Sequence, residues 1–215
     1  MKITGDYFKH KRDKMAHSVC TKLEMMSLTG IILAGGNSSR MGADKGLVQL
    51  KGRHMIEHVA DVAGTVCDEI IIIAGNSEYR QLGYTVYSDI IKNSGPLGGI
   101  YTGLTHSNSE NNLVVSCDIP FITRNMLKFI IKNSRDSEIT IPIYHGKSEP
   151  LCGLYHKNCI LIIREFLLKK EFKLLEALKN FNTKKVDIAS CKKFSEKLFR
   201  NINTPEDLME AEKII

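Results

Sequence analysis

The amino-acid sequence predicts an α/β protein in three layers: a mostly parallel sheet with helices on both faces. Short apolar runs that indicate buried strands alternate with helical patterns along most of the 215 residues. The runs are apolar throughout, not at every second position, as expected of strands covered on both faces. Strand–helix alternation of this kind is typical of three-layer folds.

Five strands are expected in the first two thirds of the chain. They span residues 28–34, 69–75, 84–89, 112–118 and 138–144, and each is a short apolar or β-branched run. Helical patterns lie between them at residues 53–66, 97–107 and 123–133. The order of these elements predicts strand–helix–strand units that share one sheet.

After residue 145 the regular alternation of strand and helix patterns ends. Residues 146–155 predict a turn and a strand that forms an antiparallel hairpin with 138–144, and residues 157–181 predict one broken helix or two helices. A last helix is expected near the end, with Thr204 as N-cap, Pro205 in its first position and Asp207 in its third. With no linker in sight, residues 28–215 are predicted to form a single domain.

Composition and charge favour an ordinary globular protein, because the chain is 43% hydrophobic and 25% charged. The net charge of +6 comes without a dense basic stripe, so a nucleic-acid partner is not suggested. No apolar run approaches the length that spans a bilayer, so no membrane partner is expected. Residues 1–27 are basic and lack an apolar signal region, so we expect a disordered N-terminal extension. Six cysteines without paired spacing indicate reduced thiols and a cytoplasmic protein.

A glycine-rich loop follows the first predicted strand, in the stretch IILAGGNSSRMGADKGL at residues 31–47. Gly35 and Gly36 allow the backbone to approach a ligand closely, and exposed N–H groups in such a loop bind anions. Arg40 and Lys45 add positive charge, so the ligand is expected to be a polyphosphate. The loop fits neither a Walker A sequence nor the G-x-G-x-x-G dinucleotide fingerprint.

The same loop, as Leu33 to Lys45, resembles the signature of the molybdenum cofactor guanylyltransferase family. Further blocks resemble that family in the same order along the chain: SDIIKNSGPLGGI at 88–100, SCDIPFI at 116–122, EPLCGLY at 149–155 and NINTPEDL at 201–208. The resemblance implies a Rossmann-like, nucleotide-diphospho-sugar-transferase-like fold. It also implies transfer of GMP from GTP to molybdopterin or the molybdenum cofactor, with release of pyrophosphate.

The resemblance further implies roles for individual residues. Lys45, Arg40 and Asp118 would be catalytic, and Asp118, at the end of an apolar strand, would bind Mg²⁺, which prefers one or two carboxylates plus phosphate oxygens. The implied GTP-binding residues are Leu33, Ala34, Gly35, Gly36, Lys45, Asn76, Asp89, Gly95, Pro96, Leu97 and Asp118. Those implied on the molybdopterin side are Glu149, Pro150, Asn201 and Asn203. A monomer is expected, which hands its product to a molybdoenzyme or a delivery protein.

Three alternatives remain at this point. A sister cytidylyltransferase would use CTP on the same cofactor, and spacing alone does not choose the base. A nucleotide-binding sensor could retain the pocket, although the intact set of four residues argues against it: Arg40, Lys45, Asp89 and Asp118. The motif H-x-x-E-H at residues 54–58 would suit a zinc hydrolase, but an amphipathic helix with a solvated polar face explains it more simply.

Overall fold

The computed structural model describes residues 27–35, 44–189, 191 and 194–214. Residues 1–26 of the expected N-terminal extension therefore lie outside the described residues. Among the described residues, no helix has the length and apolar character that crossing a membrane would need.

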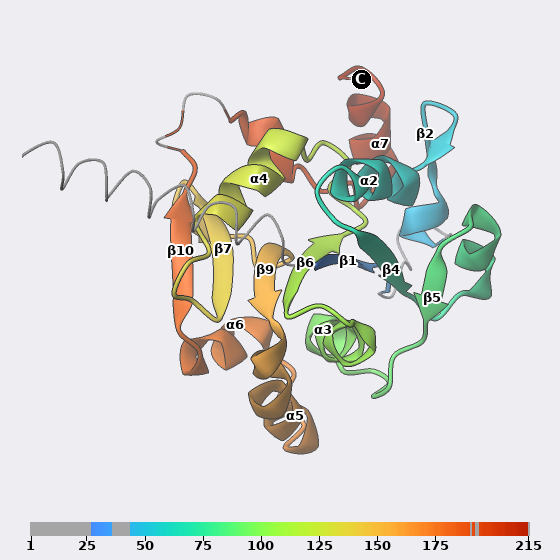
Figure 1. Cartoon of the computed structure of the whole chain (residues 1–215). Helices are drawn as coiled ribbons and strands as arrows, with labels where there is room; N and C mark the ends of the chain where they lie inside the picture. Colours follow the sequence, from blue (N-terminus) through green and yellow to red (C-terminus); the bar gives the residue numbers. More distant parts are fainter. Residues whose placement is uncertain (1–26, 36–43, 190, 192–193, 215) are drawn as a thin grey trace, which may run out of the picture.

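One twisted sheet forms the middle layer (Figure 1). Its strands are β1 (Leu28–Leu33), β4 (Glu69–Ile73), β5 (Thr85–Tyr87), β6 (Asn111–Ser116), β7 (Ile139–Tyr144), β8 (Lys147–Ser148), β9 (Cys152–His156) and β10 (Thr183–Asp187). The order is β10-β7-β9-β6-β1-β4-β5, with β8 paired to β7. Strands β1, β4, β5 and β6 are mutually parallel, and β9 runs antiparallel to both of its neighbours. The predicted fold class is confirmed.

Helices cover both faces of this sheet. They are α2 (Met55–Gly64), α3 (Gly95–His106), α4 (Arg124–Lys132), α5 (Ile160–Leu168), α6 (Leu174–Ala177) and α7 (Pro205–Ala211). Short 3-10 turns are η1 (Lys45–Leu47), η2 (Ser77–Leu82), η3 (Lys157–Cys159), η4 (Leu178–Asn180) and η5 (Glu196–Phe199). Helices α2 and α4 lie over one face, whereas α3, α5 and α6 lie over the other (Figure 1).

Alternate side chains of each strand enter two separate cores. Ile32 and Val115 pack under α2 and α4, whereas Ile31, Leu33 and Val114 pack under α3 and α5. Burial of both faces is the reason why these strands are largely apolar on both sides and do not alternate apolar and polar residues. A third, smaller cluster joins α7 to α2 and brings the end of the chain back to the sheet.

The five expected strands and the hairpin of β7 with β8 are confirmed, and the expected helix at 53–66 begins later than predicted. Residues 53–54 form β3 (Arg53–His54), which pairs with β2 (Gln49–Leu50), so α2 starts at Met55. Thr204 caps α7 as expected, through a reciprocal capping box with Asp207.

Strand β10 was not predicted. Its residues, TKKVD, bury only Val186, so no apolar run marks it, yet it pairs in parallel with β7 at the edge of the sheet.

Candidate functional site

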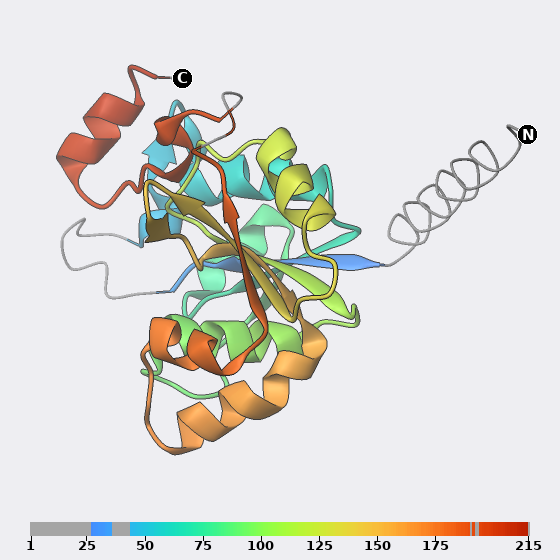
Figure 2. The same ribbon diagram turned by 90° about the vertical axis from the view of Figure 1, so that its left-hand side faces the viewer.

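The predicted site residues that the structure describes lie mainly at the edge of the sheet where its parallel strands end. In Figure 2, β1 (blue) lies in the middle layer, between the helices that cover the two faces of the sheet. Leu33 lies opposite both Ile73 and Ser116, so the carboxyl ends of β1, β4 and β6 are level with one another. Because β9 is antiparallel, it starts at this edge, with Cys152 opposite Val115. Ligands of open α/β sheets bind at such an edge, where the strand order reverses next to β1.

Asp118 follows β6 and is fixed on two sides. Ser116 Oγ donates a hydrogen bond to Asp118 Oδ1 at 2.6 Å, and the Ile202 N–H donates to the Asp118 carbonyl oxygen at 2.9 Å. Lys45 Nζ lies 3.8 Å from Asp118 Oδ2, and the two side chains are only 27% and 18% exposed. Lys45 of the glycine-rich loop and Asp118 at the end of β6, both predicted from the sequence as site residues, are therefore neighbours in space.

Lys45 also binds the C-terminal segment, because its Nζ donates to Asn203 Oδ1 at 2.5 Å. The position of Asn203 is set in turn by Asp207, whose carboxylate accepts the N–H groups of Asn203 and Thr204, both at 3.0 Å. The hydrogen bond from the Asn203 backbone is the main reason why the pKa of Asp207 lies below its ordinary value. Asn203, which was expected on the molybdopterin side, thus contacts Lys45 of the glycine-rich loop.

The end of β1 leaves little of its backbone for a ligand until Gly35. Leu33 and Ala34 are buried, the Ala34 N–H donates to the Ile73 carbonyl at 2.9 Å, and the Leu33 carbonyl accepts from the Cys117 N–H. Gly35 is exposed. Gly36 and Arg40, the other predicted contacts of this loop, lie outside the described residues.

Asp89 follows β5 and faces the start of α3. Burial raises its pKa, and within the described part of the chain its Oδ1 is enclosed without a hydrogen-bond partner. A Cβ added at Gly99 would lie 3.1 Å from Leu33 Cδ2 and 3.8 Å from Asp89 Oδ1, so the glycine lets α3 approach both. An enclosed acceptor of this kind suits the N–H donors of a nucleobase or a ribose hydroxyl.

The N-terminus of α3 offers backbone more than side chains. Gly95 has a φ of +60°, which favours glycine, and it is exposed together with Pro96. The Leu97 side chain is fully buried in the core, so a contact of Leu97 with a nucleotide would use its backbone.

Three further predicted residues take part in local turns. The Asn76 side-chain oxygen accepts the Glu78 N–H at 2.9 Å and caps η2, so its NH₂ group is the part that could donate to a ligand.

Glu149, 17% exposed, forms an ion pair with Lys147 at 2.9 Å. The Pro150 carbonyl accepts the Tyr155 hydroxyl at 2.7 Å. Asn201, by contrast, is half-buried directly before the Ile202 that binds Asp118.

The histidines of the H-x-x-E-H motif serve the backbone around α2. His54 Nδ1 lies 2.6 Å from the Leu47 carbonyl oxygen, and His58 Nε2 lies 3.0 Å from that of Leu50. Glu57 accepts the His54 N–H at 2.8 Å and caps the helix. Over the described residues, no three His, Cys, Asp or Glu side chains are grouped to hold a metal. The zinc-hydrolase alternative therefore has no support from this geometry.

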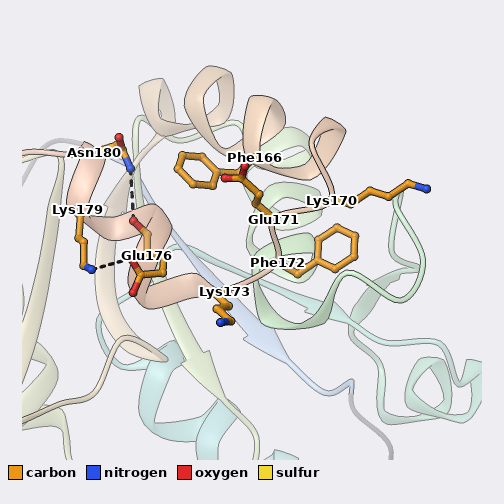
Figure 3. A pocket seen from close by; sticks show the side chains of 8 residues that line it. All are labelled: Phe166, Lys170, Glu171, Phe172, Lys173, Glu176, Lys179 and Asn180. Atoms are coloured by element: carbon orange, nitrogen blue, oxygen red, sulfur yellow. Dashed lines mark hydrogen bonds and ion pairs between the residues drawn. The ribbon is translucent and has the colours of Figure 1, made fainter.

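A surface hollow lies between α5 and α6, apart from Lys45, Asp89 and Asp118 (Figure 3). Phe166 and Phe172 line it, and Lys179 Nζ donates to Glu176 Oε2 at 2.6 Å within it. Of the predicted site residues with a described position, none takes part in its lining. The chemistry-bearing side chains meet at the sheet edge instead.

Sequence reasoning missed three residues around Lys45 and Asp118: Ser116 binds Asp118, Asp44 caps the turn that begins at Lys45, and Tyr79 donates to Asp44. Ser116 stands two positions before Asp118 and could have been noted as a strand-end hydroxyl. Asp44, two residues before a glycine, has the pattern of a side chain that caps its own turn. Tyr79 has no local signal, because its partner Asp44 lies 35 positions away.

This fold, with a lysine of the strand–loop turn and a strand-end aspartate meeting at the switch point, defines a nucleotidyltransferase-like protein. The chain matches the family model described as the MobA-like NTP transferase domain over residues 30–182. It therefore belongs to the MobA-like NTP transferase family.

Individual relatives agree with this assignment. A protein of Natranaerobius thermophilus named "Probable molybdenum cofactor guanylyltransferase" is 38% identical over 198 residues, which cover 88% of this chain and 97% of that protein. A protein of the same name from Flavobacterium johnsoniae is 36% identical and covers 86% and 96%.

Solved structures agree as well. Molybdopterin-guanine dinucleotide biosynthesis protein A from Archaeoglobus fulgidus is 25% identical, with a TM-score of 0.74 over 86% of this chain and 97% of that one. A 2-C-methyl-D-erythritol 4-phosphate cytidylyltransferase from Thermus thermophilus, at 15% identity and a TM-score of 0.67, covers 88% and 98% and shows the fold alone. The chain thus has the nucleotide-diphospho-sugar-transferase fold.

Proposed function

We propose that this protein transfers GMP from GTP to the terminal phosphate of molybdopterin or its molybdenum form. A phosphate oxygen of the pterin attacks the α-phosphorus of GTP, the bond from that phosphorus to the bridging oxygen breaks, and pyrophosphate leaves. The observation that carries the proposal is the meeting of Lys45 and Asp118 at the carboxyl edge of the sheet, in a chain whose relatives bear the name of this activity.

The chemistry demands positioning and charge neutralisation more than covalent help from the protein. Lys45 is proposed to bind the triphosphate, with Arg40 and the backbone of Gly35 and Gly36 beside it. Asp118 is proposed to bind Mg²⁺. Asp118 fits this role because its carboxylate stands directly beyond the end of β6, is partly exposed, and has its Oδ2 on the side of Lys45. A magnesium ion prefers such a site, in which phosphates and water complete its ligands.

The two substrates are proposed to bind on opposite sides of this pair. Asp89 and the α3 start at Gly95–Leu97 lie toward β5 and suit the guanosine, and Asn76 follows the strand between them and β1. Glu149, Pro150 and Asn201 lie toward β9 and the C-terminal segment and suit the pterin. The attacking phosphate then approaches the α-phosphorus from the side opposite the departing pyrophosphate, in line with the bond that breaks.

GTP is available in the cytoplasm, where we propose that the reaction takes place. In keeping with that reducing compartment, each of the five cysteines in the described part of the chain is a free thiol. We further propose that the enzyme acts as a monomer and passes its product to a molybdoenzyme or a delivery protein.

Nucleotide competition tests the proposal. Pyrophosphate release would be measured with molybdopterin, Mg²⁺ and GTP, CTP or ATP in turn, and the pterin product identified by mass spectrometry. Release that requires both GTP and the pterin is the expected result. Preference for CTP would replace the proposal with a cytidylyltransferase, and release without pterin would indicate a hydrolase. Omission of Mg²⁺ should abolish turnover, and activity that persists in a chelator would refute the metal assignment.

A further inference from the structure

We infer that Tyr79, a buried tyrosine outside the motifs of the glycine-rich loop, is a positioning residue for Lys45 and acts on it through Asp44. The inference rests on the proposed function, since it assumes that Lys45 binds the nucleotide phosphates. It adds to the site a residue from η2, which follows β4. The contact ties the turn after β4 to the loop after β1.

The contact between these two loops is a hydrogen bond. The Tyr79 hydroxyl donates to Asp44 Oδ1, and the same oxygen faces the Gly46 N–H at 3.4 Å. Asp44 is the N-cap of η1, the turn whose first residue is Lys45. Whatever holds the Asp44 carboxylate therefore also sets the direction in which the neighbouring Lys45 side chain leaves the backbone.

Packing fixes the same turn from a second direction. Gly46 is buried, and a Cβ added to it would lie 2.6 Å from the Tyr79 hydroxyl oxygen and 3.1 Å from a ring carbon. The glycine therefore allows the turn to lie directly on the tyrosine ring. Tyr79 itself is completely buried in the core under α2, so its ring is a rigid support.

The hydroxyl remains a donor at every pH of interest. Burial, and then the hydrogen bond to Asp44, raise the pKa of Tyr79 far above its ordinary value. The phenol thus keeps its proton and cannot become a second negative charge beside the Asp44 carboxylate. This arrangement suits a fixed support and not an acid or a base in the reaction.

The test is Tyr79→Phe, which removes the hydroxyl and keeps the ring. We expect kcat/KM for GTP to fall about tenfold, the effect of one hydrogen bond to a charged group, while KM for the pterin stays unchanged. Ile130→Val is the matched control, because Ile130 is fully buried in the same core but belongs to α4. It should lower the melting temperature and leave kcat/KM as it is.

A second measurement separates positioning from general stability. The dissociation constant for GTP would be measured for Tyr79→Phe in the wild-type chain and in the Lys45→Ala chain. If Tyr79 acts through Lys45, the roughly tenfold loss of affinity disappears once Lys45 is absent, as coupled residues show in double-mutant cycles. Equal losses in both backgrounds, or none in the wild type, would overturn the inference.

The failure of the proposed function would look different. If wild-type protein prefers another nucleotide, the choice of guanine falls, and the same cycle is measured with that nucleotide. If wild-type protein binds no nucleoside triphosphate, the proposed function and the role of Tyr79 fall together. If the proposed function is correct and only the role of Tyr79 is wrong, the Tyr79→Phe variant turns over GTP as the wild type does.

Discussion

Replacement of Asp118 by asparagine tests the centre of the site most directly. The substitution keeps the size of the side chain and an oxygen that can accept from Ser116, whose hydroxyl lies 2.6 Å from Asp118 Oδ1. It removes only the charge that faces Lys45 Nζ at 3.8 Å. The variant should therefore fold, and a change in turnover can be attributed to lost charge.

The size of the effect follows from the surroundings of the carboxylate. Two unit charges about 4 Å apart attract each other by about 4 kcal/mol at an effective dielectric constant of about 20. Loss of one preorganised electrostatic group in an active site costs about 3–4 kcal/mol. We therefore expect the activation free energy to rise by at least about 3 kcal/mol, so that kcat/KM falls more than about 100-fold.

The free energy of unfolding should change much less than the activation energy. Partly exposed ion pairs contribute about 1 kcal/mol or less to stability, which in a chain of this length shifts the melting temperature by about 2–4 °C. The assay is pyrophosphate release at saturating Mg²⁺, with calorimetry of the same samples.

Asp61→Asn is the control for the loss of charge. Asp61 pairs with Arg53 at 2.8 Å, the two side chains are 55% and 47% exposed, and neither residue is among the proposed site residues. The control should leave kcat/KM unchanged. Turnover of Asp118→Asn within about threefold of wild type would refute the electrostatic reasoning, since that corresponds to less than about 1 kcal/mol.

Three further predictions concern other parts of the molecule. Gly103→Ala should lower the melting temperature by several degrees in calorimetry, because its Cβ would lie 2.4 Å from Ile31 Cγ2 and overpacking costs about 1–3 kcal/mol. Asn203→Ala should lower kcat about tenfold in the pyrophosphate assay by removing the acceptor of Lys45; unchanged kcat would contradict this. The pKa of Asp207 is lowered in the folded state, so its carboxylate stabilises the fold at neutral pH, and this contribution disappears as the pH falls below the ordinary value of 3.8. Acid denaturation of Asp207→Asn should lack that contribution.

The strands could be predicted because burial on both faces leaves a strong sequence signal. Strand β10 lacks it, as its pairing with β7 is an edge contact with a single buried residue. The β2–β3 ribbon was missed for a different reason. Its turn needs a positive φ at both Lys51 and Gly52, with values of 54° and 77°, and only the glycine signals such a turn.

The site could be predicted as far as its residues follow strands. Asp89 and Asp118 stand directly behind apolar runs, so their common edge follows from parallel pairing alone. The contacts of Lys45 could not be predicted in the same way. Asn203 is 158 positions away from it, and no periodicity relates the two residues. Such partners are chosen by the tertiary fold, which sequence patterns of one element do not describe.

The C-terminal segment contributes two contacts to this site, through Ile202 and Asn203. The family model ends at residue 182, yet the Ile202 N–H binds the Asp118 carbonyl and Asn203 binds the Lys45 side chain. Asn203 is itself held by the capping box of α7 through Asp207. A helix cap of ordinary strength, about 1 kcal/mol, is therefore linked through Asn203 to the position of Lys45, and so to the pair that we propose binds GTP and Mg²⁺. Any change that loosens the start of α7 should lower turnover before it unfolds the sheet.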